Sequence, residues 1–463
     1  MTVLNSTAQR DIENLAHPYT NLATHPEIGP TVIVRGKGVT VWDDKGKDYI
    51  EGMAGLWCTA FGYGEEELIE AAAEQMRKLA YTHLFAGKSH EPAIALAEKL
   101  KEIAPLPVSK VLFACSGSES NDTLIKLIWY YNNAKGRPEK KKIISRNKAY
   151  HGVTIASASM TGLAPVQRDF DLPVSDRFIY TDCPHYYHGG QPGESEEDFA
   201  GRMASNLEAL IEKEGPETVA AMFAEPIMGA GGAIVPPATY FEKIRPVLDR
   251  HDILLVTDEV ICGFGRTANM FGCETFNMKP DFMTVAKALS SGYLPISAVT
   301  IPEPVFEAMQ DESRKIGTFG HGYTYGGHPV SAAVAVKTLE LYEKRKILDH
   351  VRKMEPVFQK RLKTLEDHPL VGEAVGRGLI GGIELVADKA THRNFDAKHG
   401  IANFCGARCH HHGLVVRPLA GDRIAVCPPL IINEAEINEL FDRYTRALDD
   451  TLDHVTKNKL AAA

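Results

Sequence analysis

The stretch DILLVTDEV, residues 252–260, gives the clearest indication of the fold class of this 463-residue chain, because a short apolar run ends there in two adjacent carboxylates. Such a run is typical of a strand buried on both faces of a parallel sheet. Similar runs are KVLFA (110–114), KKIIS (141–145), VAAMFAE (219–225) and DFMTVAK (281–287). Between them, stretches such as SNDTLIKLIWYYNN (120–133) repeat apolar residues every three or four positions, as helices with one buried face do. The alternation predicts an α/β fold in which crossover helices join a mostly parallel sheet.

The two ends of the chain have a different pattern. Residues 32–55, VIVRGKGVTVWDDKGKDYIEGMAG, alternate as an antiparallel meander does. After Pro329 a helical pattern is followed by short strands and an acidic closing helix. We therefore expect a large domain over residues 61–328 and a smaller α/β domain over residues 329–463, to which residues 1–60 contribute.

Composition excludes several classes of protein. Lys plus Arg number 51 and Asp plus Glu number 60, so the formal charge of −9 disfavours a nucleic-acid partner. The eight cysteines lie far apart and predict reduced thiols, and hence a cytoplasmic protein. We expect no membrane partner, because no run of about 18 apolar residues occurs and the first residues do not resemble a signal peptide.

Polar residues follow three of the predicted strands, at the edge where open α/β sheets bind ligands. CSGSES (115–120) precedes a predicted helix, and its Ser116, Gly117 and Ser118 suit a phosphate at a helix N-terminus. Taken alone, the same residues are more often an ordinary helix cap. Asp258 ends one strand and Lys287 ends the next.

Alone, Asp258 is typical of a helix cap and Lys287 of a surface lysine. Together with a phosphate cradle they predict pyridoxal phosphate (PLP) chemistry. A lysine amine forms a Schiff base with the PLP aldehyde, and a carboxylate keeps the pyridine nitrogen protonated.

Six ordered motifs resemble the class III (subgroup II) PLP-dependent aminotransferases: SGSES, AYHG (149–152), AEPIMGAGG (224–232), DEVICGFGRT (258–267), AKALSSGYLP (286–295) and HGYTYGGHP (321–329). The resemblance runs from about Trp42 to the closing helix. It implies PLP fold type I, the fold of aspartate aminotransferase. MAGLWC (53–58) and CPPLII (427–432) are most similar to the ω-amino acid and amine:pyruvate transaminases.

The resemblance assigns roles to individual positions. Lys287 matches the Schiff-base lysine, and Asp258 the partner of the pyridine nitrogen. The other cofactor-binding positions that it implies are Gly117, Ser118, Tyr150, His151, Glu225, Val260 and Thr324, the last reaching the phosphate of the neighbouring subunit. Trp57 and Tyr150 match walls of the substrate pocket, and Arg417 matches an arginine that pairs with a substrate carboxylate. A core Trp and a surface Arg are the alternatives for Trp57 and Arg417.

The sequence departs from this pattern in a few places. Cys115 and Ser120 replace the usual residues of the phosphate loop, and TYGGHP replaces TYSGHP. The segment after Pro418 is one residue longer than in relatives, which affects the expected reach of Arg417.

Two further signals predict no additional site. Gly376, Gly378 and Gly381 fit a dinucleotide pattern, but the context predicts a strand leaving a glycine turn. Cys409 and the three histidines after it are adjacent on a predicted helix, so they do not converge on a metal. We expect no metal.

The predicted function is PLP-dependent ω-transamination, in which an amine or ω-amino acid donates its amino group and a keto acid, pyruvate, accepts it. We expect a homodimer with shared active sites, which could pair into a tetramer. The alternatives are a 2-oxoglutarate-dependent aminotransferase of the GABA or ornithine type, an aminomutase or decarboxylase of the same fold, and a non-catalytic binding protein.

Overall fold

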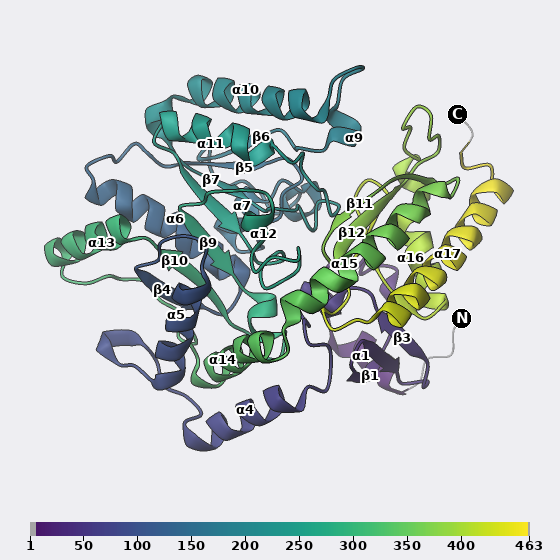
Figure 1. Ribbon diagram of the computed structural model, residues 1–463, viewed down its shortest axis with the longest axis horizontal. Coiled ribbons are helices and arrows are strands. Elements are labelled where there is room, and N and C mark those ends of the chain that lie inside the picture. The colour runs from purple at the N-terminus through teal and green to yellow at the C-terminus, as the bar shows by residue number, and fades with distance from the viewer. Residues whose placement is uncertain (1–5, 462–463) are drawn as a thin grey trace.

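A seven-stranded sheet forms the centre of the larger part of the molecule (Figure 1). The structure is a computed structural model that describes residues 6–461. In sheet order the strands are β4 (Lys110–Ala114), β10 (Ser297–Ile301), β9 (Phe282–Val285), β8 (Leu254–Asp258), β7 (Val219–Ala224), β5 (Lys142–Arg146) and β6 (Phe178–Thr181). The five predicted strands are all present, and β6 and β10 are additional. Strands β7, β9 and β10 are buried along their whole length.

The sheet is parallel from β6 to β9, and β10 is the exception. It pairs antiparallel with both β9 and β4. Residues 286–296 connect β9 to β10, and this connection is shorter than the roughly dozen residues that a parallel crossover needs. The chain therefore turns back beside β9, and β4 lies beyond the returning strand.

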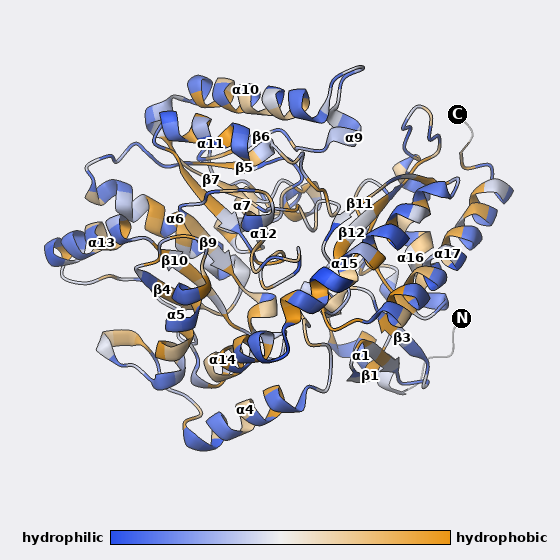
Figure 2. Cartoon of the chain, in the orientation of Figure 1, coloured by the Kyte–Doolittle hydropathy of each residue, from blue (hydrophilic) through white to orange (hydrophobic). Residues whose placement is uncertain are grey.

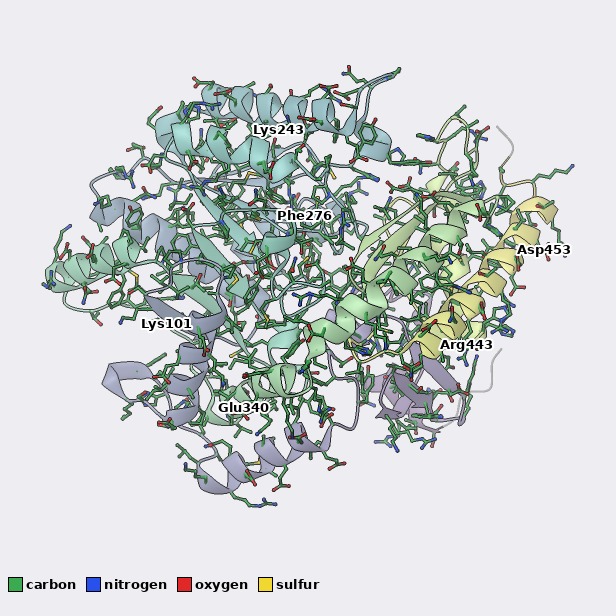
Figure 3. The ribbon with its side chains drawn as sticks, in the orientation of Figure 1. Lys101, Lys243, Phe276, Glu340, Arg443 and Asp453 are labelled. Carbon is green, nitrogen blue, oxygen red and sulfur yellow. The ribbon has the colours of Figure 1, made fainter. Side chains whose placement is uncertain are left out.

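Helices cover the large sheet with their apolar faces inward (Figure 2). They include α6 (Gly117–Ala134), α10 (Glu196–Glu214), α11 (Tyr240–Arg250) and α13 (Glu303–Ile316). Helix α10 packs against α11, and α13 against α6. Figure 3 labels Lys243 of α11, whose side chain is 31% exposed, and Phe276, which is 4% exposed. This arrangement leaves the carboxyl ends of the strands free to form a site.

Two four-stranded sheets lie beside the large one. The first consists of β1 (Ile33–Lys37), β2 (Thr40–Asp43), β3 (Asp48–Glu51) and β13 (Leu414–Val415). The predicted N-terminal meander is confirmed, and the parallel pairing of β13 with β3 joins both ends of the chain. The second sheet consists of β11 (Val371–Arg377), β12 (Ile380–Leu385), β15 (Arg423–Val426) and β14 (Arg417–Leu419). The domain boundaries at residues 60 and 328 stay predictions.

Further helices lie at the edge of the large sheet and in the flanking parts (Figure 1). They are α1 (Ser6–Asn14), α2 (His25–Ile28), α3 (Ala54–Trp57), α4 (Glu66–Lys78), α5 (Glu91–Ile103), α14 (Pro329–Lys344), α15 (Ile347–Thr364), α16 (Ile401–His411) and α17 (Glu434–Lys457). Helix α14 packs against α4 and α5, and α17 against α15 and α16. Short helices in the large part are α7 (Ile155–Met160), α8 (Ala164–Gln167), α9 (Tyr186–Gly189) and α12 (Gly272–Thr275). None of the helices within residues 6–461 combines the length and apolarity that a membrane crossing needs.

The glycine pattern near residue 378 forms a hairpin between β11 and β12, as the sequence predicts. Gly378 has a φ of +58° and lies against the backbone of Arg266, where a Cβ would not fit. The eight cysteines are all free thiols.

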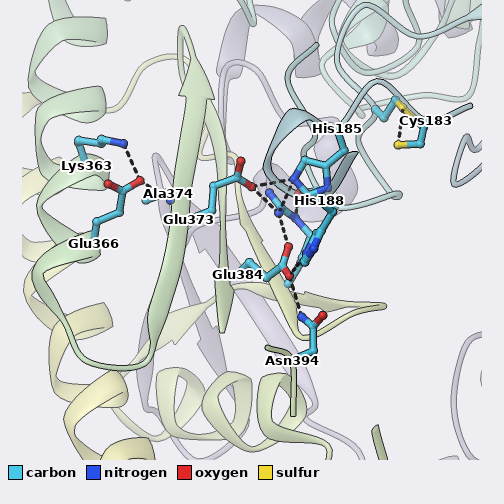
Figure 4. Close-up of polar contacts among 12 residues, drawn as sticks. Cys183, His185, His188, Lys363, Glu366, Glu373, Ala374, Glu384 and Asn394 are labelled. Atoms are coloured by element: carbon cyan, nitrogen blue, oxygen red, sulfur yellow. Dashed lines mark hydrogen bonds and ion pairs between the residues drawn. The ribbon is translucent and has the colours of Figure 1, made fainter. Parts of the chain in front are cut away.

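A buried ion network connects the second small sheet to the large part (Figure 4). Arg423 Nη1 donates to Glu373 Oε2 at 2.6 Å and to Glu384 Oε2 at 2.7 Å. His185, from the segment between β6 and α9, contacts Glu373 at 2.9 Å through Nε2. Arg423 Nε also donates to the carbonyl of Gly232, which is in the AEPIMGAGG segment. The network thus fixes a loop that reaches the functional site.

Candidate functional site

A cavity of about 150 Å³ lies at the carboxyl ends of β7, β8 and β9. The sequence motifs predict eleven site positions, and the structure brings ten of them to this cavity. These ten are Trp57, Gly117, Ser118, Tyr150, His151, Glu225, Asp258, Val260, Lys287 and Arg417. Thr324 does not line it.

Asp258 is the most strongly held carboxylate of the cavity. Its Oδ2 accepts hydrogen bonds from His151 Nδ1 at 2.8 Å and from Asn121 Nδ2 at 2.9 Å. Its Oδ1 accepts one from the N–H of Val260 at 3.1 Å. Thr284 Oγ1, from β9, donates to Asn121 Oδ1 and so fixes the orientation of the amide. Asp258 is therefore a preorganised carboxylate at the end of its strand.

Lys287 follows β9 and directs its amine into the same cavity. Its backbone has a φ of +48°, a left-handed conformation that is uncommon for non-glycine residues. The amine makes no hydrogen bond or ion pair with any residue between 6 and 461. Burial lowers the pKa of Lys287, and the nearby Cys58 thiol and Asp258 carboxylate raise it by less. A larger share of this amine is therefore neutral than for a lysine in water.

Helix α6 begins at the wall of the cavity. Ser116 caps it, because Ser116 Oγ accepts a hydrogen bond from the N–H of Glu119 at 3.2 Å. The cap and the anion cradle are compatible, since the N–H groups of Gly117 and Ser118 remain free within the described chain. A Cβ on Gly117 would lie 2.9 Å from Val260 Cγ2. The glycine thus lets Val260 approach the helix N-terminus.

Glu225 and the AYHG segment form a second wall. Glu225 Oε1 accepts a hydrogen bond from the N–H of Tyr150 at 3.0 Å, and Oε2 accepts one from the N–H of Gly229 at 2.9 Å. Burial raises the pKa of Glu225, and the neighbouring His151 lowers it by less. In this structure Glu225 holds two loops in place beside the cavity.

Trp57 is 3% exposed and closes one side of the cavity. Its φ is +65°, and Ala54 and Gly55 also have positive φ values, so the backbone of α3 is kinked. This conformation directs the indole of Trp57 and the side chain of Leu56 toward the cavity.

Arg417 lies between this cavity and a second one of about 770 Å³. Its guanidinium carbon is 5.9 Å from the ring centre of Tyr19, and Tyr19 and Tyr150 line both cavities. No carboxylate of residues 6–461 pairs with Arg417. Burial lowers the pKa of Arg417, but it remains a cation, since an unperturbed guanidinium titrates far above neutrality.

Thr324 is exposed in the monomer. Its carbonyl accepts a hydrogen bond from Tyr81 Oη at 2.8 Å. The predicted contact of Thr324 with a neighbouring subunit stays a prediction.

Six lining residues have no role in the sequence-based prediction: Tyr19, Leu56, Asn121, Gly152, Ala230 and Ile261. The last three lie within the AYHG, AEPIMGAGG and DEVICGFGRT motifs. Asn121 directly follows the SGSES segment. An amide side chain about one helical turn after the predicted phosphate cradle could have indicated a role at the site. Leu56 is adjacent to Trp57 in MAGLWC. Nothing in the sequence indicates a role for Tyr19 at the site, because only folding brings its N-terminal segment there.

The arrangement fits pyridoxal phosphate. The unpartnered Lys287 amine suits an aldehyde, the fixed Asp258 carboxylate suits a protonated ring nitrogen, and the free N–H groups of Gly117 and Ser118 suit a phosphate. A Cβ on Gly152 would lie 2.5 Å from Ser118 Oγ, so the glycine leaves room at this cradle. Val260 and Tyr150 line the cavity as the faces of a ring site would.

Comparisons with known proteins agree with this geometry. The sequence model described as "Aminotransferase class-III" matches residues 23–448. The chain is 49% identical over 443 residues to gamma aminobutyrate transaminase 3, chloroplastic, of Solanum lycopersicum, covering 96% of this chain and 85% of that one. It is 46% identical over 458 residues to gamma-aminobutyrate transaminase 1, mitochondrial, of Oryza sativa subsp. japonica, covering 98% and 88%.

A solved structure is also close. The crystal structure of the omega transaminase from Pseudomonas jessenii in complex with PMP is similar with a TM-score of 0.95 and 51% identity. The match covers 98% of this chain and 99% of that one. Fold, site and sequence therefore lead to one assignment: the chain belongs to the class-III aminotransferases, PLP-dependent enzymes of fold type I.

Proposed function

We propose that this aminotransferase transfers the amino group of an amine or ω-amino acid to pyruvate. The observation that supports the choice of pyruvate is the number of cationic side chains that line the two cavities. Among the described residues that line the two cavities, Arg417 and Lys287 are the only cations, and Lys287 is required for the chemistry. One guanidinium suits a keto acid with one carboxylate better than one with two, because each buried carboxylate needs its own partner.

Bound PLP supplies an electron-accepting ring to which a substrate amine becomes covalently attached. Asp258, held by His151 and Asn121, keeps a negative charge where the ring nitrogen is protonated. The Lys287 amine, with its pKa lowered by burial, would take a proton from the substrate's reacting carbon and pass it on to the cofactor within the same half-reaction. It would carry a proton in the opposite direction when the keto acid is aminated. Since one cavity serves donor and acceptor in turn, we expect ping-pong kinetics.

The walls fit donors of two kinds. Trp57, Leu56 and Tyr150 present apolar and aromatic surface, which suits an amine with an apolar substituent. Arg417 suits the carboxylate of an ω-amino acid through two parallel hydrogen bonds. The cavity of about 770 Å³ that adjoins Arg417 gives room for either donor.

A 2-oxoglutarate-dependent enzyme of the GABA type is the second candidate. The relatives named gamma-aminobutyrate transaminases, at 46–49% identity, favour GABA as a donor. GABA is itself an ω-amino acid, so the two candidates differ chiefly in the acceptor.

A matrix of donors and acceptors tests the proposal. Holoenzyme is incubated with β-alanine, GABA or 1-phenylethylamine, each with pyruvate or with 2-oxoglutarate, and alanine or glutamate is measured. We expect alanine from at least one donor, with a higher kcat/KM for pyruvate. Glutamate as the preferred product would contradict the acceptor assignment. Absence of turnover with either keto acid would favour an aminomutase or decarboxylase.

Lys287→Ala provides the control for the chemistry. We expect wild-type protein to show the visible absorption of a PLP Schiff base and to lose it on borohydride reduction, and Lys287→Ala to lack it. A wild-type protein that ignores added PLP would instead support a non-catalytic role.

We also propose a homodimer with shared active sites. Large apolar side chains are exposed on the segments that carry Thr324 and the cavity-lining residues, and on the segment of Tyr81, which contacts Thr324: Leu56, Tyr81, Phe85, Val153, Ile155 and Tyr325. Tyr81 and Tyr325 pack against each other with ring centres 5.7 Å apart. An exposed apolar surface of this kind is typical of an interface.

Sedimentation and a Thr324→Ala variant test this assembly. We expect a dimer, and a weaker PLP affinity for Thr324→Ala with Lys287 unchanged. A monomer with full activity would contradict the proposal. The cytoplasmic location remains a prediction from composition.

A further inference from the structure

Three metal-ligating side chains converge near the N-terminus, outside the cavity. They are Asp11 of α1, His17 of the following loop and His25 of α2. Their nearest ligand atoms all lie within 4.8 Å of one another. His17 Nε2 is 2.8 Å from Asp11 Oδ1, and His25 Nε2 is 3.5 Å from the same oxygen. The centres of the two imidazole rings are 4.4 Å apart.

The geometry suits a tetrahedral cation. Bonds of about 2.0–2.2 Å place tetrahedral ligand atoms about 3.4 Å apart. The distance from His25 to Asp11 is close to this value already, and the pair His17–Asp11 needs to open by roughly half an ångström. Two imidazoles and one carboxylate are a donor set of Zn²⁺ sites, with a fourth position left for water.

An orphaned atom supports a ligand at this place. His25 Nε2 is buried and has no hydrogen-bond partner. A buried polar atom without a partner is destabilising, and a metal bond would remove that cost. The side chains of Asp11, His17 and His25 are 16%, 28% and 13% exposed, so a cation from solvent can reach them.

We propose that Asp11, His17 and His25 form a Zn²⁺-type metal site that holds the N-terminal segment over the mouth of the cavity. The two histidines flank residues 18–24, which include Tyr19. A metal bound to both ends closes this segment into a short loop and restricts its conformations. Tyr19 then stays beside Arg417, where it lines both cavities. The three ligands come from separate elements that only folding brings together, which is why the sequence predicts no metal.

The other cluster of similar composition does not fit a metal. His185, His188 and Glu384 also bring their ligand atoms within 4.8 Å. There the guanidinium of Arg423 lies 2.7 Å from Glu384 Oε2 and already compensates its charge. A second cation would be repelled at this distance.

Zinc binding by the holoenzyme tests the proposal. After removal of free PLP, wild type, Asp11→Asn, His17→Gln and His25→Gln are dialysed against Zn²⁺, and bound zinc is measured by atomic absorption. We expect one tight zinc per wild-type chain. Each variant should lose more than about 100-fold in affinity, since loss even of an outer-shell partner costs about 10- to 100-fold. Retained cofactor absorption shows that the variants fold.

The matched control is His412→Gln. His412 Nε2 contacts Asp450 Oδ2 at 2.7 Å, as His17 contacts Asp11, but the third partner is Arg408 instead of an imidazole. This variant should bind zinc as wild type does. A second readout is cleavage of residues 15–24 by subtilisin, which zinc should slow in wild type and not in His25→Gln. Zinc binding that is absent, or unchanged in the three variants, would overturn the proposal.

Discussion

Asp258 and Glu259 are adjacent carboxylates that the backbone directs to opposite environments. Asp258 lines the cavity, whereas Glu259 accepts hydrogen bonds from the N–H groups of Gly272 and Cys273 at 2.8 and 2.7 Å. Burial raises the pKa of Glu259 to about 7. The sequence could not show which carboxylate lines the cavity and which one caps a helix. Glu259 caps α12, and only the folded chain brings the N–H groups of α12 to Glu259.

Substituting the two carboxylates separates chemistry from stability. We expect Asp258→Asn to lower kcat by about 100-fold or more, as the loss of one preorganised charge does. Glu259→Gln should keep kcat and lose about 1–3 kcal/mol of stability, because an amide group would face a backbone N–H. Both are measured as kcat per bound cofactor and as thermal unfolding. Similar kcat losses in both variants would contradict the assignment.

Glu51 makes stability depend on pH. Its Oε1 accepts a hydrogen bond from the N–H of Met53 at 3.0 Å, and burial raises the pKa of Glu51 from 4.5 to about 7. Between pH 4.5 and about pH 7, Glu51 keeps a proton in the folded chain that it has released in the unfolded chain. Stability therefore falls as pH rises from about 4.5 to about 7, by roughly 3 kcal/mol from this residue.

Glu51→Gln should remove this dependence. We expect the melting temperature of the variant, relative to that of wild type, to rise between pH 5 and pH 8. The other titrating groups are common to both proteins and do not change this difference. Parallel curves of melting temperature against pH would show that Glu51 titrates normally.

At the level of elements, the contact between α6 and the turn after β8 depends on Gly117. We expect Gly117→Ala to weaken PLP binding, because the new Cβ lies 2.9 Å from Val260 Cγ2 and overpacking costs about 1–3 kcal/mol. The double variant Gly117→Ala/Val260→Ala should recover part of the affinity. The PLP dissociation constant is the measurement.

Gly201→Ala is the matched control. Gly201 lies on α10, and a Cβ added there would have no neighbouring atom within 4 Å. Alanine at this position should therefore leave PLP binding unchanged and favour the helix. If Gly117→Ala bound PLP as tightly as wild type does, a steric role for Gly117 would be excluded.

In the molecule as a whole, the Arg423 network joins the second small sheet to the large part. Arg423 is 1% exposed and compensates Glu373 and Glu384. We expect Arg423→Met to lose about 3–5 kcal/mol of stability, because it leaves the buried Glu384 and the half-buried Glu373 without this cation. The bond from Arg423 to Gly232 is lost as well, which loosens a loop beside the cavity.

Combined and control variants test the role of this network. Arg423→Met with Glu373→Gln and Glu384→Gln should recover stability, since no unpaired charge remains. Arg77→Met removes an exposed pair with Glu70, 71% and 58% exposed, and should cost less than about 1 kcal/mol. Unfolding of wild type and the three variants gives the comparison, and an equal loss for Arg423→Met and Arg77→Met would contradict it.

Five of the seven strands of the large sheet, helices between them and the residues that follow the strands could be predicted from the amino-acid sequence. Apolar runs and helical spacing are local properties, and the carboxyl ends of parallel strands meet at one edge, so Asp258, Lys287 and Gly117 were predictable as a group. The antiparallel return of β10 was not, because it depends on the length of one connection.

Contacts between distant segments became visible only in the folded chain. Tyr19 reaches Arg417, Asn121 orients Asp258, and Arg423 compensates charges from two other strands. Each contact joins residues from separate elements that are far apart in the sequence, and no local pattern encodes such a pairing. Their geometry depends on how packed elements bring side chains together, which is a property of the close-packed interior and not of any one segment.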